Sequence, residues 1–395
     1  MSLFVFTIVI GILNGLDIYT PDHDTLMTHV HAGTLGWLTL AVAGTALVIF
    51  TEDRGLTSDE ASTLNRLSWL LPGAVVLYVL AFFAGDRIPG DRIQRPIVGT
   101  LLFIVVVWFG YWLYKQNKTH ESSSVVRLGV MLAWLSLVIG AVLGILLGVY
   151  SARGEIPGFD DATAANLADA HPGSMVIGFL ILAAAAIAEW LIRSPRTLAE
   201  DRLGAAQMWM IFTAGIVFII AFAADIEDLL GPANLLELVA AGILVTRLRH
   251  HLAPSAWKGS GVGVYGRLSV VFLVVNLAVL TYLVSQVVSG TIDFDALTES
   301  QLGLLLTLDH LMFLGVMTLA AFGSVAKAVH PDGLVTADKI LLWGVGVGVS
   351  AFAIGLITVT AEIKRVATPI LGTALLIGIG LYIAEMKAHT HSDAR

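Results

Sequence analysis

Cysteine is absent from this chain of 395 residues. Its absence excludes disulfides, iron-sulfur clusters, a thiolate copper centre and the C-x-x-C-H attachment of a c-type haem. Any bound metal must therefore be held by histidine, methionine or carboxylate groups. Charged residues are also scarce, at 13% of the chain, whereas hydrophobic residues make up 57%. This balance is typical of membrane proteins with several spans and not of soluble globular proteins.

Basic residues are too few and too scattered to indicate a nucleic-acid partner. The net charge is -8, and no basic stripe is present. A surface that binds nucleic acid needs a patch of positive charge. We therefore expect the lipid bilayer, and no nucleic acid, as the main partner of the chain.

Twelve apolar segments are long enough to cross a bilayer. They are residues 3–19, 27–50, 68–85, 95–114, 127–149, 173–193, 206–224, 229–247, 266–289, 303–328, 340–361 and 368–386. Backbone groups in lipid must pair within their own segment, so these segments should be helices. The first lacks a basic start and an A-x-A site, which favours a retained helix over a cleaved signal. No linker divides the chain, so the sequence predicts one all-α, polytopic membrane domain over residues 1–395.

Lysine and arginine are distributed unevenly between the loops. If the N-terminus lies inside, 16 of the 22 basic residues lie in inner loops or in the C-terminal tail. The positive-inside rule therefore predicts a multi-pass protein of the cell (inner) membrane with both termini in the cytoplasm. In this orientation His29 and His31 open the second segment at its outer end.

Three of the segments that start at the outer face resemble one another. His31 begins HAGTLGWLTLAVAG and His310 begins HLMFLGVMTLAAFG, and seven of fourteen positions agree without a gap. The agreeing pairs are His31/His310, Leu35/Leu314, Gly36/Gly315, Thr39/Thr318, Leu40/Leu319, Ala41/Ala320 and Gly44/Gly323. The sixth segment joins more weakly, with His171 opposite His29. Because these are segments 2, 6 and 10, we expect three pseudo-symmetric four-helix units, about 1–125, 126–262 and 263–395.

Four histidines lie at the outer ends of these related segments: His29, His31, His171 and His310. Ionisable side chains within a membrane are costly and by default mark functional sites. Imidazole suits iron, copper and zinc, and no cysteine competes for the role. Haem between facing helices is the most economical explanation, because its macrocycle suits an apolar interior while its propionates reach the wet edge. For any single histidine, the alternative is a neutral ring bonded to a backbone carbonyl.

With these histidines in place, the sequence resembles subunit I of the haem-copper oxidase and nitric oxide reductase superfamily. It also resembles the smaller haem proteins of membranes that are implicated in nitric oxide tolerance. The resemblance implies metal ligands near the outer ends of helices 2, 6, 7 and 10. It implies that His310 binds a low-spin haem together with His29 or His31. The cofactor would be haem b, held non-covalently.

Other positions of the family pattern are missing from this chain. Leu308 stands where the ligand of the high-spin haem belongs. The sixth segment keeps His171 and Pro172 but reads HPGSM, without the family's tyrosine, and the seventh lacks the histidine pair of the copper site. We therefore expect no copper and no oxygen reduction by the family mechanism. Whether the chain is an oxidoreductase stays open, and the sequence assigns no catalytic residue.

The repeat suggests how the histidines pair. Two residues along a helix turn by about 200°, so His29 and His31 face opposite pores. The resemblance implies that helix 10 directs the first position of its H-x-H to the pore before it and the second to the pore after it. If the second segment does likewise, His29 would face His310 in one pore, and His31 would face His171 in the next, giving two haems. If the sixth segment is instead aligned by its His-Pro, His171 faces the vacated oxidase site and only one haem remains. The sequence leaves both arrangements open.

Basic residues offer partners for haem propionates. Lys364 and Arg365 follow the eleventh segment on the outer side, where the resemblance implies such partners. An exposed pair at a helix end is the alternative interpretation. Arg87, Arg92 and Arg95 could serve the other haem, and a solvated loop is again the alternative.

The sequence thus predicts a haem-binding membrane b-type cytochrome on a scaffold similar to that of the haem-copper oxidases. It would carry low-spin bis-His haem and act in electron transfer or in nitric oxide or oxygen chemistry, near the outer face. Its partners would be an electron-donor protein or quinone and other respiratory subunits. One alternative is a proton-coupled transporter with Glu189 and Glu237 as relays, although no pair of broken helices marks a substrate site. The other is a respiratory subunit without cofactors.

Overall fold

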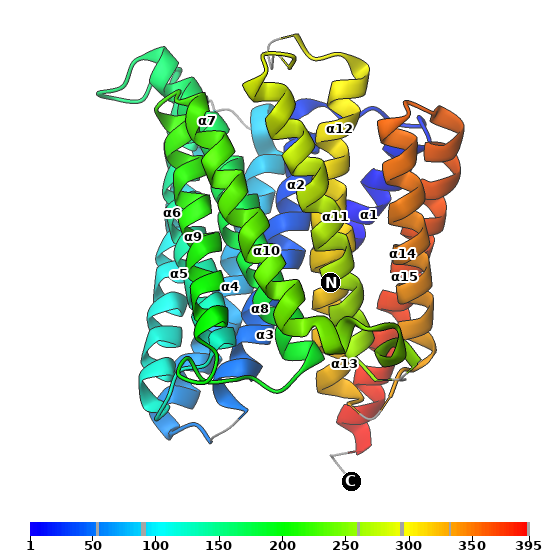
Figure 1. Ribbon diagram of the computed structural model, residues 1–395. Helices are drawn as coiled ribbons and strands as arrows, with labels where there is room; N and C mark the ends of the chain where they lie inside the picture. Colours follow the sequence, from blue (N-terminus) through cyan, green and yellow to red (C-terminus); the bar gives the residue numbers. More distant parts are fainter. Residues whose placement is uncertain (53–54, 88–91, 259–260, 293–295, 332, 393–395) are drawn as a thin grey trace. The chain divides into compact units, whose positions relative to one another are not determined.

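The computed structural model describes residues 1–52, 55–87, 92–258, 261–292, 296–331 and 333–392 (Figure 1). These residues are almost entirely helical and contain no β-strand. Within them, eleven helices are long and apolar enough to cross a membrane. The prediction of an all-α, polytopic membrane protein is therefore confirmed. The expected first span, residues 3–19, is a shorter apolar helix of 14 residues, Ser2–Gly15.

The helices follow the apolar segments of the sequence. They are α1 Ser2–Gly15, α2 His23–Gly33, α3 Leu40–Thr51, α4 Ser58–Ala84, α5 Gln94–Thr119, α6 Val125–Arg153, α7 Asp161–Gly173, α8 Ile181–Ile192, α9 Arg202–Ala223, α10 Leu230–Leu252, α11 Gly263–Val288, α12 Glu299–His310, α13 Leu319–Val329, α14 Thr336–Ile357 and α15 Ala361–Ser392. Three π-helical segments, η1 Thr34–Thr39, η3 Ser174–Leu180 and η7 Leu311–Thr318, join α2 to α3, α7 to α8 and α12 to α13. Each joined set forms one continuous span.

Polar residues between the apolar segments fix where the helices begin. The Asp22 carboxylate accepts a hydrogen bond from the Thr25 amide at 2.7 Å and caps α2. This bond holds the pKa of the Asp22 carboxyl below its ordinary value. Asp160 caps α7 in the same way, and Thr57 with Glu60 forms a capping box at α4. Such side chains satisfy amides that have no partner within the first turn.

The chain divides into two compact units. The first comprises Met1–Pro21, Ile187–Ser194 and Leu248–Arg395, and the second comprises Asp22–Ala186 and Pro195–Arg247. These boundaries differ from the expected repeat boundaries near residues 125 and 262, and the three-unit symmetry stays a prediction. Within the first unit, α14 packs along α15, and α1 packs against α15 (Figure 1).

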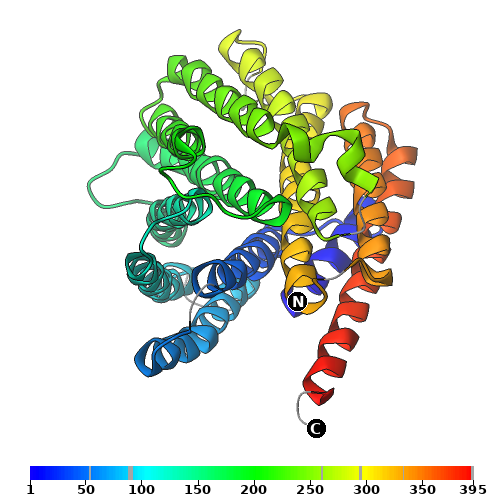
Figure 2. The same ribbon diagram turned by 60° about the horizontal axis from the view of Figure 1, so that its bottom comes forward.

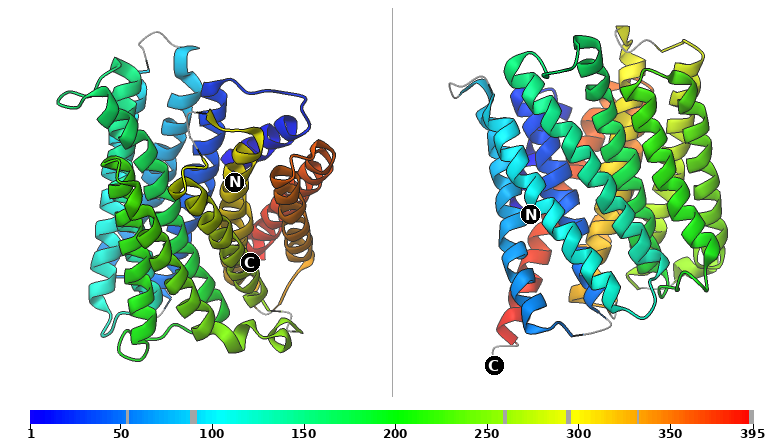
Figure 3. Two further views of the ribbon diagram at one scale, coloured as in Figure 1. Left: turned by 45° about the horizontal axis from the view of Figure 1, so that its top comes forward. Right: turned by 90° about the vertical axis from the view of Figure 1, so that its left-hand side faces the viewer.

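Helices of the second unit are packed in chain order. Helix α5 contacts α4 on one side and α6 on the other, as the blue-to-cyan ribbons show (Figures 2 and 3). Helices α7 and η3 pack against both α6 and α9. Gly178 of η3 and Gly215 of α9 make this approach close, because a Cβ on Gly215 would lie 2.8 Å from the Gly178 Cα atom. Small residues at such crossings let two membrane helices touch along their backbones.

Candidate functional site

The three spans that the sequence relates to one another each contain a π-helical segment. These are η1, η3 and η7, and every π-helical segment in the described part of the chain belongs to one of these spans. The matched residues Thr39 and Thr318 end η1 and η7. A π-helical turn breaks the regular α-helical hydrogen bonds and is frequent at functional sites. The related sequences thus share an uncommon local structure.

The two matched threonines also make the same hydrogen bond. The Thr39 hydroxyl donates to the carbonyl oxygen of Thr34 at 3.0 Å, and the Thr318 hydroxyl donates to that of Phe313 at 2.8 Å. In both cases the acceptor lies five residues earlier in the chain, the same spacing as the backbone hydrogen bonds of a π-helix. This agreement supports the relation between the second and tenth spans beyond their sequence identity. The sixth span has Ile181 at this position and therefore lacks the bond, while the Ser174 hydroxyl at the start of η3 donates to the Ser136 carbonyl on α6 at 3.2 Å.

His31 and His310 have matching ring environments. The Nδ1 atom of His31 lies 2.7 Å from the Met27 carbonyl oxygen, and that of His310 lies 2.7 Å from the Leu306 carbonyl oxygen. A carbonyl oxygen only accepts, so Nδ1 must be the donor in both rings. The proton is thereby fixed on Nδ1, and Nε2 keeps the lone pair that a metal binds.

His171 has the same ring chemistry with a partner on another helix. Its Nδ1 donates to the Gly140 carbonyl of α6 at 2.9 Å. The ring lies against Gly144, where a Cβ atom would stand 3.0 Å from the ring's Cε1 atom. Gly144 therefore makes room for the imidazole, and the Gly140 carbonyl orients it.

Within the second unit, His31 and His171 lie in one neighbourhood. They are close enough to interact electrostatically. The His31 ring also stacks on Phe82 of α4 at 3.9 Å between ring centroids and meets the edge of Tyr78 at 5.6 Å. The pairing of His31 with His171 around one cofactor stays a prediction.

The other expected pair is divided between the units. His29 is half-buried on α2 in the second unit, about 200° around the helix from His31. His310 lies in the first unit, where its ring meets the edge of Phe352 on α14 at 5.0 Å. The pairing of His29 with His310 stays a prediction.

Lys364 and Arg365 contact a carboxylate of their own unit. The Lys364 Nζ atom lies 3.5 Å from one Asp17 oxygen, and the Arg365 Nε atom lies 2.9 Å from the other. These two groups hold the pKa of the Asp17 carboxyl below its ordinary value, the hydrogen bond from Arg365 being the main cause. The implied role of the two basic residues toward propionates stays a prediction.

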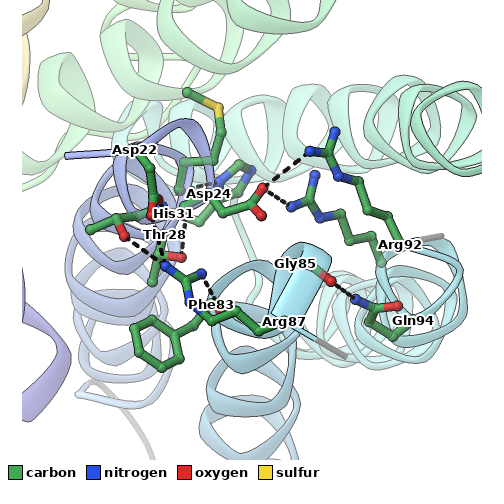
Figure 4. Close-up of polar contacts among 12 residues, drawn as sticks. Asp22, Asp24, Thr28, His31, Phe83, Gly85, Arg87, Arg92 and Gln94 are labelled. Carbon is green, nitrogen blue, oxygen red and sulfur yellow. Dashed lines mark hydrogen bonds and ion pairs between the residues drawn. The ribbon is translucent and has the colours of Figure 1, made fainter. Parts of the chain in front are cut away.

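A charged cluster surrounds the start of α2 (Figure 4). Arg95 of α5 donates to the Asp24 carboxylate at 2.5 Å, with the two side chains 3% and 9% exposed. Arg92 lies 3.7 Å from the same carboxylate, and Arg87 pairs with Asp22 at 2.9 Å. The sequence argument missed both aspartates, although Asp24 precedes His31 by seven residues, which is two helical turns.

The two candidate proton-relay carboxyls differ in their surroundings. Glu189 pairs with Arg193 one turn later at 2.5 Å. Glu237 of α10 is 1% exposed, and neither of its oxygens has a hydrogen-bond partner among the described residues. The amide nitrogen of Asn234, one turn earlier, is also buried and unpartnered. Of the two, only Glu237 has the setting of a group that could take up and release a proton.

Another buried network escaped the sequence argument. The carboxylate of Asp338, at the start of α14, accepts from the Tyr265 hydroxyl at 2.8 Å and also from the Tyr382 hydroxyl. It lies 2.9 Å from the His330 Nε2 atom and accepts from the Val335 amide at 2.7 Å. Since it joins α11, α14 and α15 of the first unit, its evident role is to hold these helices together.

No protein-family model matches the chain, and no curated protein sequence matches it. In the described part of the chain, no group of three or more His, Asp or Glu side chains could hold a metal ion. A haem iron takes only two axial protein ligands, so the paired histidines remain the site to consider.

Proposed function

We propose that the protein is a membrane b-type cytochrome that holds haem non-covalently between histidines of its π-interrupted spans. One observation carries this proposal: His31, His171 and His310 each donate Nδ1–H to a backbone carbonyl. Histidines that bind metals are held in this way, because the bond fixes the tautomer and the direction of Nε2.

The residues around His31 and His171 suit the group. Two neutral imidazoles are the donor set of a low-spin haem, and the two rings belong to one unit. Phe82 and Tyr78 line the His31 ring with aromatic surface, and Gly144 makes room for the His171 ring. In the proposed arrangement His31 and His171 would hold one haem b, and His310 would hold a second.

Two histidine ligands on one haem iron would favour electron transfer over gas binding. A bound haem would supply one-electron chemistry, while the two imidazoles would hold the iron and leave no open position for a gas. A gas such as nitric oxide would have to displace a ligand. In the proposed setting the chain lies in the cell membrane with its histidines near the outer face. It exchanges electrons with a donor protein or a quinone and with other respiratory subunits.

Single histidine variants test the proposal. The full-length protein is purified, and its haem is quantified as the pyridine haemochrome together with a reduced-minus-oxidised spectrum. His31→Ala and His171→Ala should remove one haem, and His310→Ala should remove the other. His120→Ala is the matched control, because its ring also contacts a backbone carbonyl, that of Phe50 at 3.2 Å, and His120 itself lies at the end of α5, outside the three related spans. Unchanged haem content in His31→Ala and His171→Ala would contradict the proposed ligands.

One observation favours a different function, proton-coupled transport. Glu237 is a buried carboxyl without a hydrogen-bond partner within a candidate span, and such groups are used to carry protons across membranes. Purified protein in vesicles with a pH-sensitive dye would test this. Proton flux that is present in the wild type and lost in Glu237→Gln, in protein that holds no haem, would favour the transporter over the cytochrome.

A further inference from the structure

The cluster at the start of α2 brings several arginines close to carboxylates (Figure 4). Its described side chains include three arginines, Arg87, Arg92 and Arg95, against two aspartates, Asp22 and Asp24. Arg87 pairs with Asp22 at the exposed edge, and the guanidinium groups of Arg92 and Arg95 both approach the carboxylate of Asp24. A buried positive charge is costly unless an anion compensates it.

Arg95 has an unused donor in this cluster. Its side chain is 3% exposed, and its Nε atom is buried without a hydrogen-bond partner among the residues that the structure describes. The guanidinium lies over the ring of Phe82 at 4.7 Å, and that ring also stacks on the imidazole of His31 at 3.9 Å. The unused donor therefore lies one aromatic ring away from the proposed iron ligand.

Helical geometry places the cluster at a suitable distance from His31. Asp24 and His31 are seven residues apart on α2. Along a helix this separation is a rotation about 20° short of two full turns and a rise of about 10.5 Å. They therefore share one face of the helix, with Thr28 between them. This rise is comparable to the distance from the iron of a haem to the carboxylates on the edge of its ring.

We propose that Arg95, oriented by Asp24 and assisted by Arg92, binds a propionate carboxylate of the haem that His31 ligates. A planar guanidinium with a free N–H is well suited to a carboxylate. The inference rests on the proposed function, since it assigns a binding role for the same cofactor. Of the three arginines that the sequence offered for this role, it selects the buried Arg95 as the main contact and assigns it to the haem of His31.

Esterified haem separates the carboxylate contact from the iron contact. Full-length apoprotein is titrated with haem b and with its dimethyl ester, in which both carboxylates are masked, and the Soret band is followed. Only the binding that His31→Ala abolishes is counted. The wild type should bind the ester on the order of tenfold more weakly than haem. Arg95→Gln should lose most of this preference, and the double variant Asp24→Asn/Arg95→Gln, which removes the buried pair together, should lose it as well.

Arg247→Gln is the matched control. Arg247 also belongs to a buried pair of the second unit, 2.7 Å from Asp201, with side chains 6% and 8% exposed. It should keep the preference for haem over the ester. An unchanged preference in Arg95→Gln, or an equal loss of affinity for haem and ester, would contradict the inference while leaving haem binding intact. Failure of the wild type to bind either porphyrin would contradict the proposed function itself.

Discussion

Gly144 offers a sharp test of how His171 is positioned. In Gly144→Ala the new Cβ atom would stand 3.0 Å from Cε1 and 3.5 Å from Nδ1 of the His171 ring. Replacing glycine by alanine within a helix contributes about 1 kcal/mol of stability, whereas forcing a group into a packed site costs about 1 to 3 kcal/mol. The expected sum is a loss of up to about 2 kcal/mol.

The effect on haem should exceed the effect on stability. A displaced ring lengthens the 2.9 Å hydrogen bond from Nδ1 to the Gly140 carbonyl. Changes to such supporting contacts weaken metal binding on the order of tenfold or more. Thermal unfolding in detergent measures the first effect, and Soret titration with haem measures the second.

Gly242→Ala is the control for the glycine substitution. Its Cβ would meet nothing within 4 Å, so only the gain in helix propensity applies, and haem affinity should not change. If Gly144→Ala matches Gly242→Ala in both stability and haem affinity, the packing argument for His171 is refuted.

Four further variants test the charged groups by thermal unfolding. Asp17→Asn should destabilise the protein at neutral pH. Because the pKa of Asp17 in the folded protein lies below 3.8, the difference in stability from wild type should shrink as pH falls through that lowered value. A stability difference that does not depend on pH would contradict the pairing of Asp17 with Lys364 and Arg365. Glu237→Gln should cost almost nothing, because its oxygens have no partner, whereas Glu189→Gln should cost about 3 to 5 kcal/mol by breaking its buried ion pair. The reverse order would refute this assignment. Asp338→Asn should cost at least about 2 kcal/mol, because the carboxylate accepts from two tyrosines, and wild-type stability would exclude its bracing role.

The spans could be read from the sequence because their signal is local. An apolar run of sufficient length predicts a membrane helix whatever its neighbours are, and the histidines at the starts of related runs could be found in the same way. The first span is shorter than expected because the helix ends at Gly15 and the chain turns at Asp17, where φ is 57°. A single turn residue of this kind is hard to foresee within an apolar run.

Contacts between distant residues could not be read in this way. The pairing of Arg95 with Asp24 joins positions 71 residues apart, and the Gly140 carbonyl approaches His171 only once α6 and α7 have packed. The π-helical segments have no strong composition signal of their own, although the matched threonines at their ends were visible in the repeat. Packing decides these features, and the sequence supplies only the residues that take part.

The haem content of the purified wild-type protein tests the central claim most directly. The account predicts a Soret band, a reduced-minus-oxidised spectrum typical of low-spin b-type haem, and a pyridine haemochrome ratio near two haems per chain if both proposed pairs are filled. A ratio near one haem per chain, with that haem lost in His31→Ala, would support the His31 and His171 site and contradict the second haem. A protein purified from haem-replete cells without any Soret band would contradict the account.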